Sequence, residues 1–311
     1  GGLCFVLLLR LPIGLVVAVL RVWQIMPDVV ISKGGYGSIP IVLAAAFYRI
    51  PLIVHESDVK PGAANRLAAR FATTVVVGWQ QAKESLARYA SKVAAVGIPV
   101  RTQFGQRSNQ QAKEELGLAA GFPVVTVIGG SQGARQLNEV LLQALPELIS
   151  DAAVLHVTGP REYDAVATVA QETLASLSRA DQYKVWPYVT DEMDTILSAA
   201  DVVVSRAGAT ALAELARLKK AVLLVPLPAD VSDNQQPNAA VLEAAGAAQV
   251  LDAANLGANI FLHSVRELLA DSERRQQLAT RLSQFDRPTA AADIAEIVFT
   301  LARGSAPVYA S

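Results

Sequence analysis

The chain has 311 residues, of which 52% are apolar and 18% charged, and its formal net charge is −1. This length and apolar content can fill two medium-sized cores, which favours two α/β domains. Lys and Arg are scattered, which argues against a nucleic-acid-binding protein, and the single cysteine, Cys4, excludes an internal disulfide and a Cys-based zinc site and fits a reducing compartment.

Residues 3–20 form an almost wholly apolar segment that is interrupted by Arg10, Pro12 and Gly14. The segment lacks the charged start and the cleavage site of a signal peptide. A membrane-spanning helix is not favoured, because an arginine near its middle costs about 3 kcal/mol on insertion scales. Two alternatives stay open: a buried helix, or a surface helix on the bilayer with Arg10 and Arg21 toward anionic lipid.

After Pro27 the chain repeats a unit of a short β-branched run, a loop of small residues and a helix. This alternation predicts parallel sheets covered by helices. The predicted strands are Asp28–Ser32, Leu52–Glu56, Thr74–Val77, Lys92–Val96, Val124–Ile128, Ala153–Val157, Lys184–Trp186, Val202–Ser205 and Val222–Val225.

A domain boundary is expected where the segment from Gly97 to Arg101 leads into the polar residues 103–111. Near the other end, Asp286-Arg287-Pro288 breaks the helical pattern before residues 290–302 resume it. We therefore expect a first domain at residues 1–100, a second at 101–285, and a last helix at 286–311 that leaves the second domain.

Two loops of the first domain carry unusual residues at strand ends, where ligands of parallel sheets bind. The first predicted strand ends in a glycine turn, Lys33 to Ser38, which we interpret as a phosphate contact in preference to a plain tight turn. The second is followed by His55-Glu56-Ser57-Asp58 and then by Asn65. A helix-capping network explains these residues as well as a ligand role does.

The predicted strand at 124–128 is followed by a glycine-rich turn with Gly129, Gly130 and Gly133. Glycine lets the backbone approach an anion, and the following helix start offers free N–H groups and a partial positive charge. The spacing matches neither the dinucleotide fingerprint nor a Walker loop. Leu137, Leu141, Leu145 and Leu148 recur at helical spacing, which predicts a helix that packs on a sheet and holds this loop.

The strand at 202–205 leads into Arg206-Ala207-Gly208, and Glu214 lies in the early turns of the next helix. A carboxylate there can accept from both hydroxyls of a ribose, although glutamate also favours helix starts in general. The next strand is followed by an amide-rich loop, Asp233 to Asn238, whose side chains suit sugar hydroxyls or simply face solvent.

Metal and nucleophile motifs are absent from the sequence. There is no Asp-x-Asp pair and no Gly-x-Ser-x-Gly elbow, and His55, His156 and His263 are isolated. His156 lies within an apolar strand and is interpreted as a core histidine, and His263 as a helix surface residue. We expect no metal and no cofactor, and catalysis by electrostatic positioning.

Six ordered motifs together resemble the MurG family: Lys33-Gly34-Gly35-Tyr36, His55-Glu56, Gly97-Ile98-Pro99-Val100-Arg101, Gly129-Gly130-Ser131-Gln132-Gly133-Ala134, Ser205-Arg206-Ala207-Gly208-Ala209 and Gln235-x-x-Asn238-Ala239. These enzymes transfer N-acetylglucosamine from UDP-N-acetylglucosamine to undecaprenyl-pyrophosphoryl-muramyl-peptide, converting lipid I into lipid II in peptidoglycan synthesis. The resemblance covers nearly the whole chain. It implies a GT-B fold, with two Rossmann-like parallel-sheet domains and an inter-domain cleft.

The resemblance also implies which residues bind the substrates. Arg101 and Ser131 would contact the donor pyrophosphate. The backbone of Thr190 would bind uracil, and Glu214 would bind the ribose hydroxyls. Gln235 and Gln236 bind the hexose, and Asp58, where relatives often carry Asn, belongs less securely to the sugar site. The start of the helix, which holds phosphate and ribose, comprises Ala209, Thr210, Ala211, Leu212 and Ala213. The turn with Gly34, Gly35 and Tyr36 faces the acceptor pyrophosphate.

Family members begin with another strand and a Gly-Gly-Thr-Gly-Gly-His loop whose histidine is a candidate general base, and the resemblance places that histidine upstream of Gly1. We therefore expect an incomplete N-terminal domain and assign no catalytic residue. The alternatives are a donor-binding remnant or subunit without turnover, a related lipid glycosyltransferase, and a UDP-N-acetylglucosamine epimerase. The apolar opening segment matches the membrane-associating face of the family, which implies peripheral attachment to the cytoplasmic face of the plasma membrane.

Overall fold

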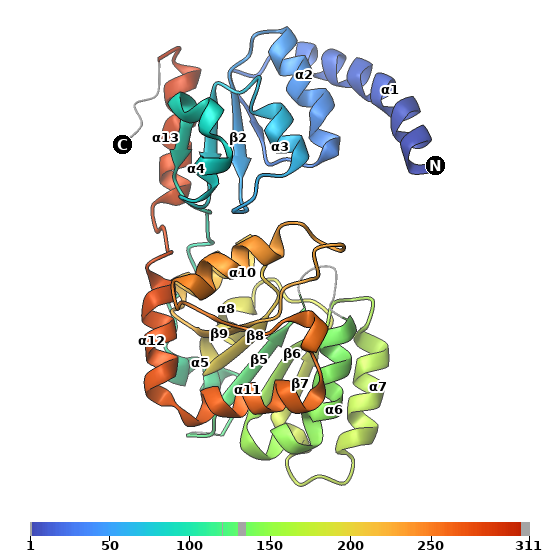
Figure 1. Cartoon of the computed structure of the whole chain (residues 1–311), viewed down its shortest axis with the longest axis vertical. Helices are drawn as coiled ribbons and strands as arrows, with labels where there is room; N and C mark the ends of the chain where they lie inside the picture. The colour runs from blue at the N-terminus through green and yellow to red at the C-terminus, as the bar shows by residue number, and fades with distance from the viewer. Residues whose placement is uncertain (1, 120, 130–134, 306–311) are drawn as a thin grey trace. The chain divides into compact units, whose positions relative to one another are not determined.

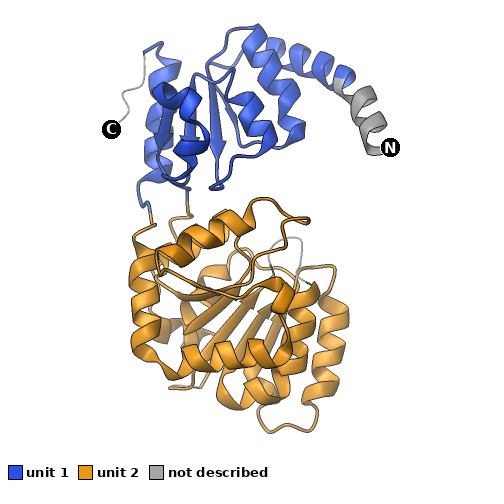
Figure 2. Ribbon diagram, in the orientation of Figure 1, with its two compact units in different colours: residues 1–99, 287–311 blue, residues 100–286 orange. Residues whose placement is uncertain are grey.

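The computed structural model describes residues 2–119, 121–129 and 135–305, with side chains from Pro12 onward. The chain divides into two compact units, one of residues 1–99 and 287–311 and one of residues 100–286 (Figure 2). Each unit contains one sheet in which every neighbouring pair of strands is parallel. The predicted fold class, two parallel-sheet α/β domains, is confirmed.

The first unit, in which Figure 1 labels β2 and α13, has a four-stranded sheet. Its strand order is β1-β2-β3-β4. Its strands are β1 Val30–Ser32, β2 Leu52–Glu56, β3 Thr74–Val77 and β4 Val93–Ala95. Its helices and 3₁₀ turns are α1 Gly2–Ile25, η1 Tyr36–Ser38, α2 Ile39–Phe47, α3 Ala63–Ala68, α4 Ala82–Ser85, η2 Ala87–Lys92 and α13 Ala290–Ala302.

The last helix, α13, completes the core of the first unit. Leu301 forms a buried cluster with Ile53 of β2 and Val76 of β3, and Ile294 and Ile297 pack against this cluster. A helix from the end of the chain therefore covers a sheet that is built by its beginning.

The second unit has a six-stranded sheet in the order β10-β9-β8-β5-β6-β7. Its strands are β5 Val124–Ile128, β6 Ala153–Val157, β7 Tyr183–Trp186, β8 Val202–Ser205, β9 Ala221–Leu224 and β10 Gln249–Val250. Its helices and 3₁₀ turns are α5 Asn109–Glu115, α6 Arg135–Asp151, α7 Tyr163–Leu174, η3 Ala180–Gln182, α8 Met193–Ala199, α9 Ala209–Arg217, α10 Gln235–Ala244, η4 Ala253–Asn255, α11 Ala258–Ala270 and α12 Ser272–Ser283. All nine predicted strands are present, and β10 was not predicted.

The α6 helix shows how the apolar pattern fixes the packing of the second unit. The predicted stripe of Leu137, Leu141, Leu145 and Leu148 is fully buried, with each side chain 0% exposed. These residues belong to a core cluster that also contains residues of β5, β6 and β8. Burying a leucine side chain stabilises a fold by about 2 kcal/mol, so this stripe holds α6 firmly on the sheet.

The α1 helix is far more exposed than a core helix. Among its described side chains, Ala18 and Val22 are buried against Ala44 of α2, but Val16, Leu20 and Trp23 are exposed. Of the two alternatives, a buried helix therefore describes only one face of residues 12–25, and the exposed face leaves the surface helix open. In the part of the chain that the structure describes, no helix combines the length and the apolar character needed to cross a bilayer.

Gly97 is expected to be required for the stability of the first unit. Its φ angle is +103°, and a Cβ added there would lie 2.5 Å from the Cβ and 2.6 Å from the Cγ of Arg287. Gly35, in the same unit, has a φ angle of +80° with open space around it. We expect Gly35→Ala to lower the free energy of unfolding by about 1 kcal/mol and Gly97→Ala by about 3 kcal/mol, measured by urea denaturation. Equal losses would contradict the steric explanation.

Candidate functional site

The six-stranded sheet has a topological switch point between β5 and β8. From β5 the chain winds outward to β6 and β7, and it then returns to β8 and winds the other way to β9 and β10. This is the strand order of the dinucleotide-binding fold, in which ligands bind at the switch point, beyond the carboxyl ends of the strands. Ile128 pairs with Ser205, so the loops that follow β5 and β8 leave the sheet at the same level.

The loop after β5 is described only at its beginning. The N–H of Gly129 donates to the carbonyl of Val157, 3.2 Å away, which continues the β5–β6 ladder by one residue. Ser131, predicted to contact a pyrophosphate, lies outside the described residues, and its role stays a prediction.

The loop after β8 ends in the start of α9. Gly208 is the N-cap residue of α9. The N–H of Leu212 donates to the carbonyl of Gly208 at 3.0 Å, which is the first hydrogen bond of the helix. The N–H groups of Ala209, Thr210 and Ala211 therefore precede the regular ladder and are oriented to receive an anion. The Leu212 side chain is buried in the core, so any ligand contact from Leu212 must come from its backbone.

Three predicted donor-site residues that lie far apart in sequence meet beside this helix start. One guanidinium nitrogen of Arg101, Nη1, donates to the carbonyl oxygen of Thr190 at 2.8 Å. The other, Nη2, lies 3.8 Å from Oε1 of Glu214. The guanidinium carbon is 4.8 Å from the ring centroid of Phe104, a cation–π contact with a buried ring. The structure thus brings Arg101, Thr190 and Glu214 together.

The Glu214 carboxyl is largely removed from water, with 17% of its side chain exposed. Burial raises the pKa of Glu214 to about 7, although the nearby positive charge of Arg101 acts to lower it. A group with this pKa is easily converted between a hydrogen-bond donor and a charged acceptor near neutral pH. Strongly perturbed carboxyl groups of this kind are typical of functional sites.

Two buried residues hold the loop after β8 in place. Arg206 is 5% exposed, and its Nη1 donates to the carbonyl of Val225 at 2.9 Å, which joins the ends of β8 and β9. Asn238 is fully buried, and its Nδ2 donates to the carbonyl of Ala207 at 3.1 Å. The interpretation of Asn238 as a solvent-facing loop residue is therefore wrong. For Arg206, a charged residue directly after the apolar run at 202–204 was the available signal.

Gln235 and Gln236, predicted to bind a hexose, both contact the loop after β9. The side-chain oxygen of Gln235 accepts from the N–H of Leu227 at 3.0 Å, and the amide nitrogen of Gln236 donates to the carbonyl of Leu227 at 3.3 Å. Both side chains are partly buried. Their amides therefore hold this loop, and the hexose contact stays a prediction.

The glycine turn after β1 has the backbone that only glycine adopts readily. Gly34 and Gly35 have φ angles of +92° and +80°. A Cβ on Gly34 would lie 2.7 Å from Oδ1 of Asn65, so the turn packs tightly on that buried amide. Tyr36 projects outward and is exposed.

The loop after β2 is organised by the buried carboxylate of Glu56. Its Oε1 accepts from the N–H of Asp58, and its Oε2 accepts from the N–H of Gly62 and from Nδ2 of Asn65, each at 2.9 Å. These bonds organise the loop between β2 and α3, but none of them caps α3, whose N-cap Gly62 has no side-chain hydrogen bond, so the alternative of a helix-capping network is not borne out. They fix the backbone of Asp58, and the sugar role of Asp58 stays a prediction.

His156 is a satisfied core histidine, as predicted. It is fully buried, and its ring nitrogens lie 2.9 Å from the hydroxyl of Tyr183 and 3.0 Å from Oδ1 of Asn138. Burial lowers its pKa to about 3, so it stays neutral at physiological pH. Throughout the described ranges, no group of three or more His, Cys, Asp or Glu side chains is placed to share a metal ion.

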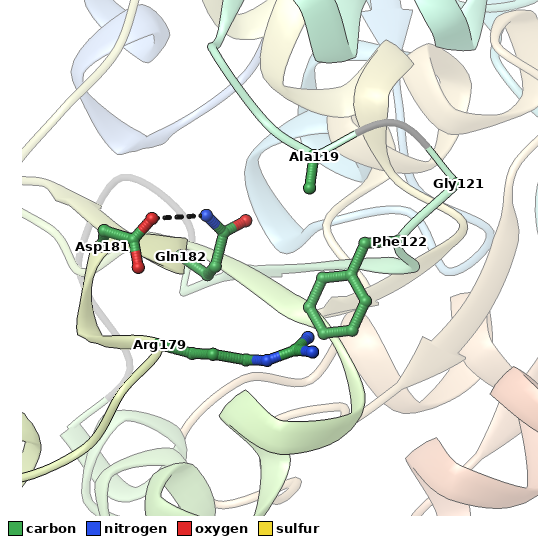
Figure 3. Close-up of a pocket in the computed structure, with 6 residues that line it drawn as sticks. All are labelled: Ala119, Gly121, Phe122, Arg179, Asp181 and Gln182. Atoms are coloured by element: carbon green, nitrogen blue, oxygen red, sulfur yellow. Dashed lines mark hydrogen bonds between the residues drawn. The ribbon is translucent and has the colours of Figure 1, made fainter.

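A surface pocket of the second unit lies away from the switch point. Its lining includes Phe122, Arg179 and Gln182, with the guanidinium of Arg179 stacked 4.4 Å from the Phe122 ring centroid (Figure 3). Phe122 precedes β5 and Gln182 precedes β7, so this pocket is at the amino ends of the strands. It is therefore not part of the candidate site.

Comparison with known proteins identifies the family. Residues 124–295 match the model of the glycosyltransferase family 28 C-terminal domain, and residues 11–77 match that of the glycosyltransferase family 28 N-terminal domain. By fold, the chain is similar to the structure of the Staphylococcus aureus MnaA–UDP complex, with a TM-score of 0.72 at 14% identity over 98% of this chain and 85% of the other.

Two further proteins are similar in sequence as well. The chain is 34% identical to the UDP-N-acetylglucosamine–N-acetylmuramyl-(pentapeptide) pyrophosphoryl-undecaprenol N-acetylglucosamine transferase of Halothermothrix orenii, over 90% of this chain and 76% of the relative. It is 26% identical to Acinetobacter baumannii MurG, with a TM-score of 0.70 over 91% of this chain and 76% of that structure. The chain therefore belongs to glycosyltransferase family 28 and, within it, to the MurG family.

Proposed function

We propose that this chain transfers N-acetylglucosamine from UDP-N-acetylglucosamine to undecaprenyl-pyrophosphoryl-N-acetylmuramyl-pentapeptide, the conversion of lipid I into lipid II. The relative in Halothermothrix orenii carries the name of this reaction. The observation that supports it most directly is the meeting of Arg101, Thr190 and Glu214 beside the start of α9, at the β5–β8 switch point.

The donor binds, in this proposal, along the carboxyl edge of the six-stranded sheet. The carbonyl of Thr190 accepts from the imide N–H of uracil, and the Glu214 carboxylate accepts from the two ribose hydroxyls. The pyrophosphate faces the N–H groups at the start of α9, the loop with Ser131, and the positive charge of Arg101. The amides of Gln235 and Gln236 face the hexose.

The reaction is an inverting displacement without a metal ion. The 4-hydroxyl of the acceptor muramyl sugar attacks the anomeric carbon of the donor, the bond from that carbon to the UDP oxygen breaks, and the hydroxyl proton is lost to a base. The β-phosphate of UDP takes up the electrons of the broken bond. The N–H groups at the start of α9 and the guanidinium of Arg101 stabilise this developing charge in a preorganised site.

The first unit supplies the acceptor side in this proposal. The N–H groups of the Gly34–Gly35 turn face the acceptor pyrophosphate, Tyr36 flanks it, and Asp58 contacts the donor sugar. Exposed apolar residues on α1, among them Leu20 and Trp23, together with Arg21 match a helix that lies on an anionic membrane surface. We infer peripheral attachment to the cytoplasmic face of the plasma membrane.

The activity is tested by incubating the protein with UDP-[14C]GlcNAc and a lipid I analogue in mixed micelles and measuring labelled lipid II. We expect transfer, and we expect Glu214→Ala to raise the KM for UDP-N-acetylglucosamine about 10-fold or more, because two hydrogen bonds to a charged acceptor are lost. Glu243→Ala, an exposed glutamate of the second unit, should leave KM unchanged. Donor binding without transfer would support the alternative of a donor-binding protein without turnover.

The pKa of Glu214 predicts how donor affinity depends on pH. The value of about 7 lies above the ordinary 4.5, so at pH 6 most of the carboxyl is protonated and cannot accept from both ribose hydroxyls. We expect the affinity for UDP-N-acetylglucosamine, whose diphosphate diester does not titrate in this range, to rise about 5- to 10-fold from pH 6 to pH 8. Calorimetry on Glu214→Gln should show a flat profile, and an identical rise in that variant would remove Glu214 from the site.

The same shift predicts a change in the stability of the ligand-free protein. Because the folded state holds the Glu214 proton more tightly than the unfolded state, the stability from this group is present at low pH and is lost as pH rises through about 7. Between pH 6 and pH 8 the free energy of unfolding of the wild type should fall relative to that of Glu214→Gln, measured by urea denaturation. A constant difference between the two proteins would contradict the raised pKa.

The membrane role of α1 is tested with the double variant Leu20→Ser/Trp23→Ser. Both side chains are more than half exposed, so their replacement should preserve the fold while removing apolar area that enters the headgroup region. Cosedimentation with vesicles that contain phosphatidylglycerol should weaken about 10-fold or more. Ile260→Ser, at a 47% exposed position of the second unit, is the matched control. Unchanged sedimentation of the double variant would rule out this helix face.

A further inference from the structure

We infer that Asp194 is a positioning residue of the uracil site: it holds the Thr190 carbonyl in place and thereby sets the selectivity for uracil over cytosine. The inference rests on the proposed function, in which that carbonyl accepts from the imide N–H of uracil. Asp194 lies in the first turn of α8, shortly after Thr190, and its side chain is 0% exposed. A carboxylate removed from water is tolerated only with good hydrogen-bond partners, so its partners indicate its role.

Both oxygens of the Asp194 carboxylate accept from one segment that is distant in sequence. Oδ1 accepts from the backbone N–H of Gly105 at 3.0 Å, and Oδ2 accepts from Nη1 of Arg107 at 2.7 Å. Nε of Arg107 also donates to the Glu115 carboxylate at 3.1 Å, so this guanidinium is held from a second side. Two charge-assisted hydrogen bonds therefore tie residues 105–107 to the start of α8.

The backbone of Thr190 lies between two buried neighbours. Val189, directly before it, is 7% exposed, and Asp194 follows it in the first turn of α8. The side chain of Thr190 is itself exposed. The position of the Thr190 carbonyl therefore depends on how firmly these neighbours are held, and Asp194 is the one that a polar contact holds.

The other end of α8 is held independently of Asp194. The side-chain nitrogen of Asn109 donates to the carbonyl of Ala199 at 2.9 Å. Nζ of the buried Lys220 donates to the carbonyls of Ser198 and Ala200, at 2.7 and 2.9 Å. Loss of the Asp194 bonds should therefore loosen the first turn of α8 and leave its last turn in place.

A fixed carbonyl discriminates between the two pyrimidines at ring position N3. Uracil carries an N–H there and can donate to the Thr190 carbonyl, whereas cytosine carries a lone pair that faces the carbonyl oxygen. A rigidly held carbonyl cannot turn away, so the wrong base leaves it unpaired and is repelled. A carbonyl that is free to turn loses part of its bond to uracil and avoids the repulsion by cytosine, so the selectivity falls for both reasons.

Calorimetric titration with UDP and with CDP tests the inference through the ratio of their dissociation constants. We expect the wild type to bind UDP about 100-fold more tightly than CDP, and Asp194→Ala to lower this ratio about 10-fold or more. Asp194→Asn keeps an oxygen for the N–H of Gly105 but loses the ion pair with Arg107, so its ratio should lie between those of the wild type and Asp194→Ala.

Asp201→Asn is the matched control, because Asp201 makes the same two kinds of bond elsewhere. Its Oδ2 accepts from Nζ of Lys113 and from the N–H of Val124, each at 2.8 Å, at the amino ends of the strands. This variant should lose stability to urea and keep the wild-type ratio of UDP to CDP affinity. Arg107→Gln, at a 37% exposed position, removes the ion pair from the other side and carries the test if Asp194→Ala does not fold. Its ratio should fall about 3-fold or more.

The outcomes separate this inference from the proposed function. An unchanged ratio in the Asp194 and Arg107 variants, with a wild type that prefers UDP, would overturn the positioning role and leave the donor site standing. An equal fall in Asp201→Asn would also overturn it, because the effect would then follow stability. A wild type that binds UDP and CDP equally would remove uracil from the Thr190 carbonyl, and the inference with it. A wild type that binds neither UDP nor UDP-N-acetylglucosamine would remove the proposed function itself.

Discussion

The proposed donor site depends on one interaction, that of the Glu214 carboxyl, shielded from water, with the Arg101 guanidinium beside it. A carboxylate in this position is unfavourable by itself, as the raised pKa of Glu214 shows, and the cation beside it compensates in part. The pair therefore keeps two opposite charges available at one edge of the sheet. A nucleoside diphosphate offers hydroxyls to the first and phosphates to the second, which is why this arrangement suits such a ligand.

The fold positions this pair through the register of its parallel strands. Because β5 and β8 are neighbours and end level with each other, the chain leaves both strands at the same edge of the sheet. Arg206 and Asn238 then fix the loop after β8 by bonds to β9 and from α10. The buried leucine stripe of α6 holds that helix on the same sheet. The proposed ligand contacts thus come from the ends of well-packed elements.

Much of this architecture could be predicted because it depends on local patterns. β-branched runs between small-residue loops located nine strands, and the helical spacing of leucines located the buried face of α6. The two-residue β10 was missed, since it is too short to show alternation. The contacts of Arg101 with Thr190 and Glu214 span about a hundred residues each, so composition and spacing alone could not reveal them, and the resemblance to a family supplied them as an expectation. The burial of α1 was the least predictable feature, because an apolar helix has the same pattern whether its faces meet protein or lipid.

A crystal structure of the protein with UDP tests the central claim most directly. We expect uracil to bond to the Thr190 carbonyl, Glu214 to accept from the ribose hydroxyls, and the phosphates to lie against the start of α9 and the Arg101 guanidinium. UDP bound elsewhere on the protein, away from Thr190 and Glu214, would contradict this.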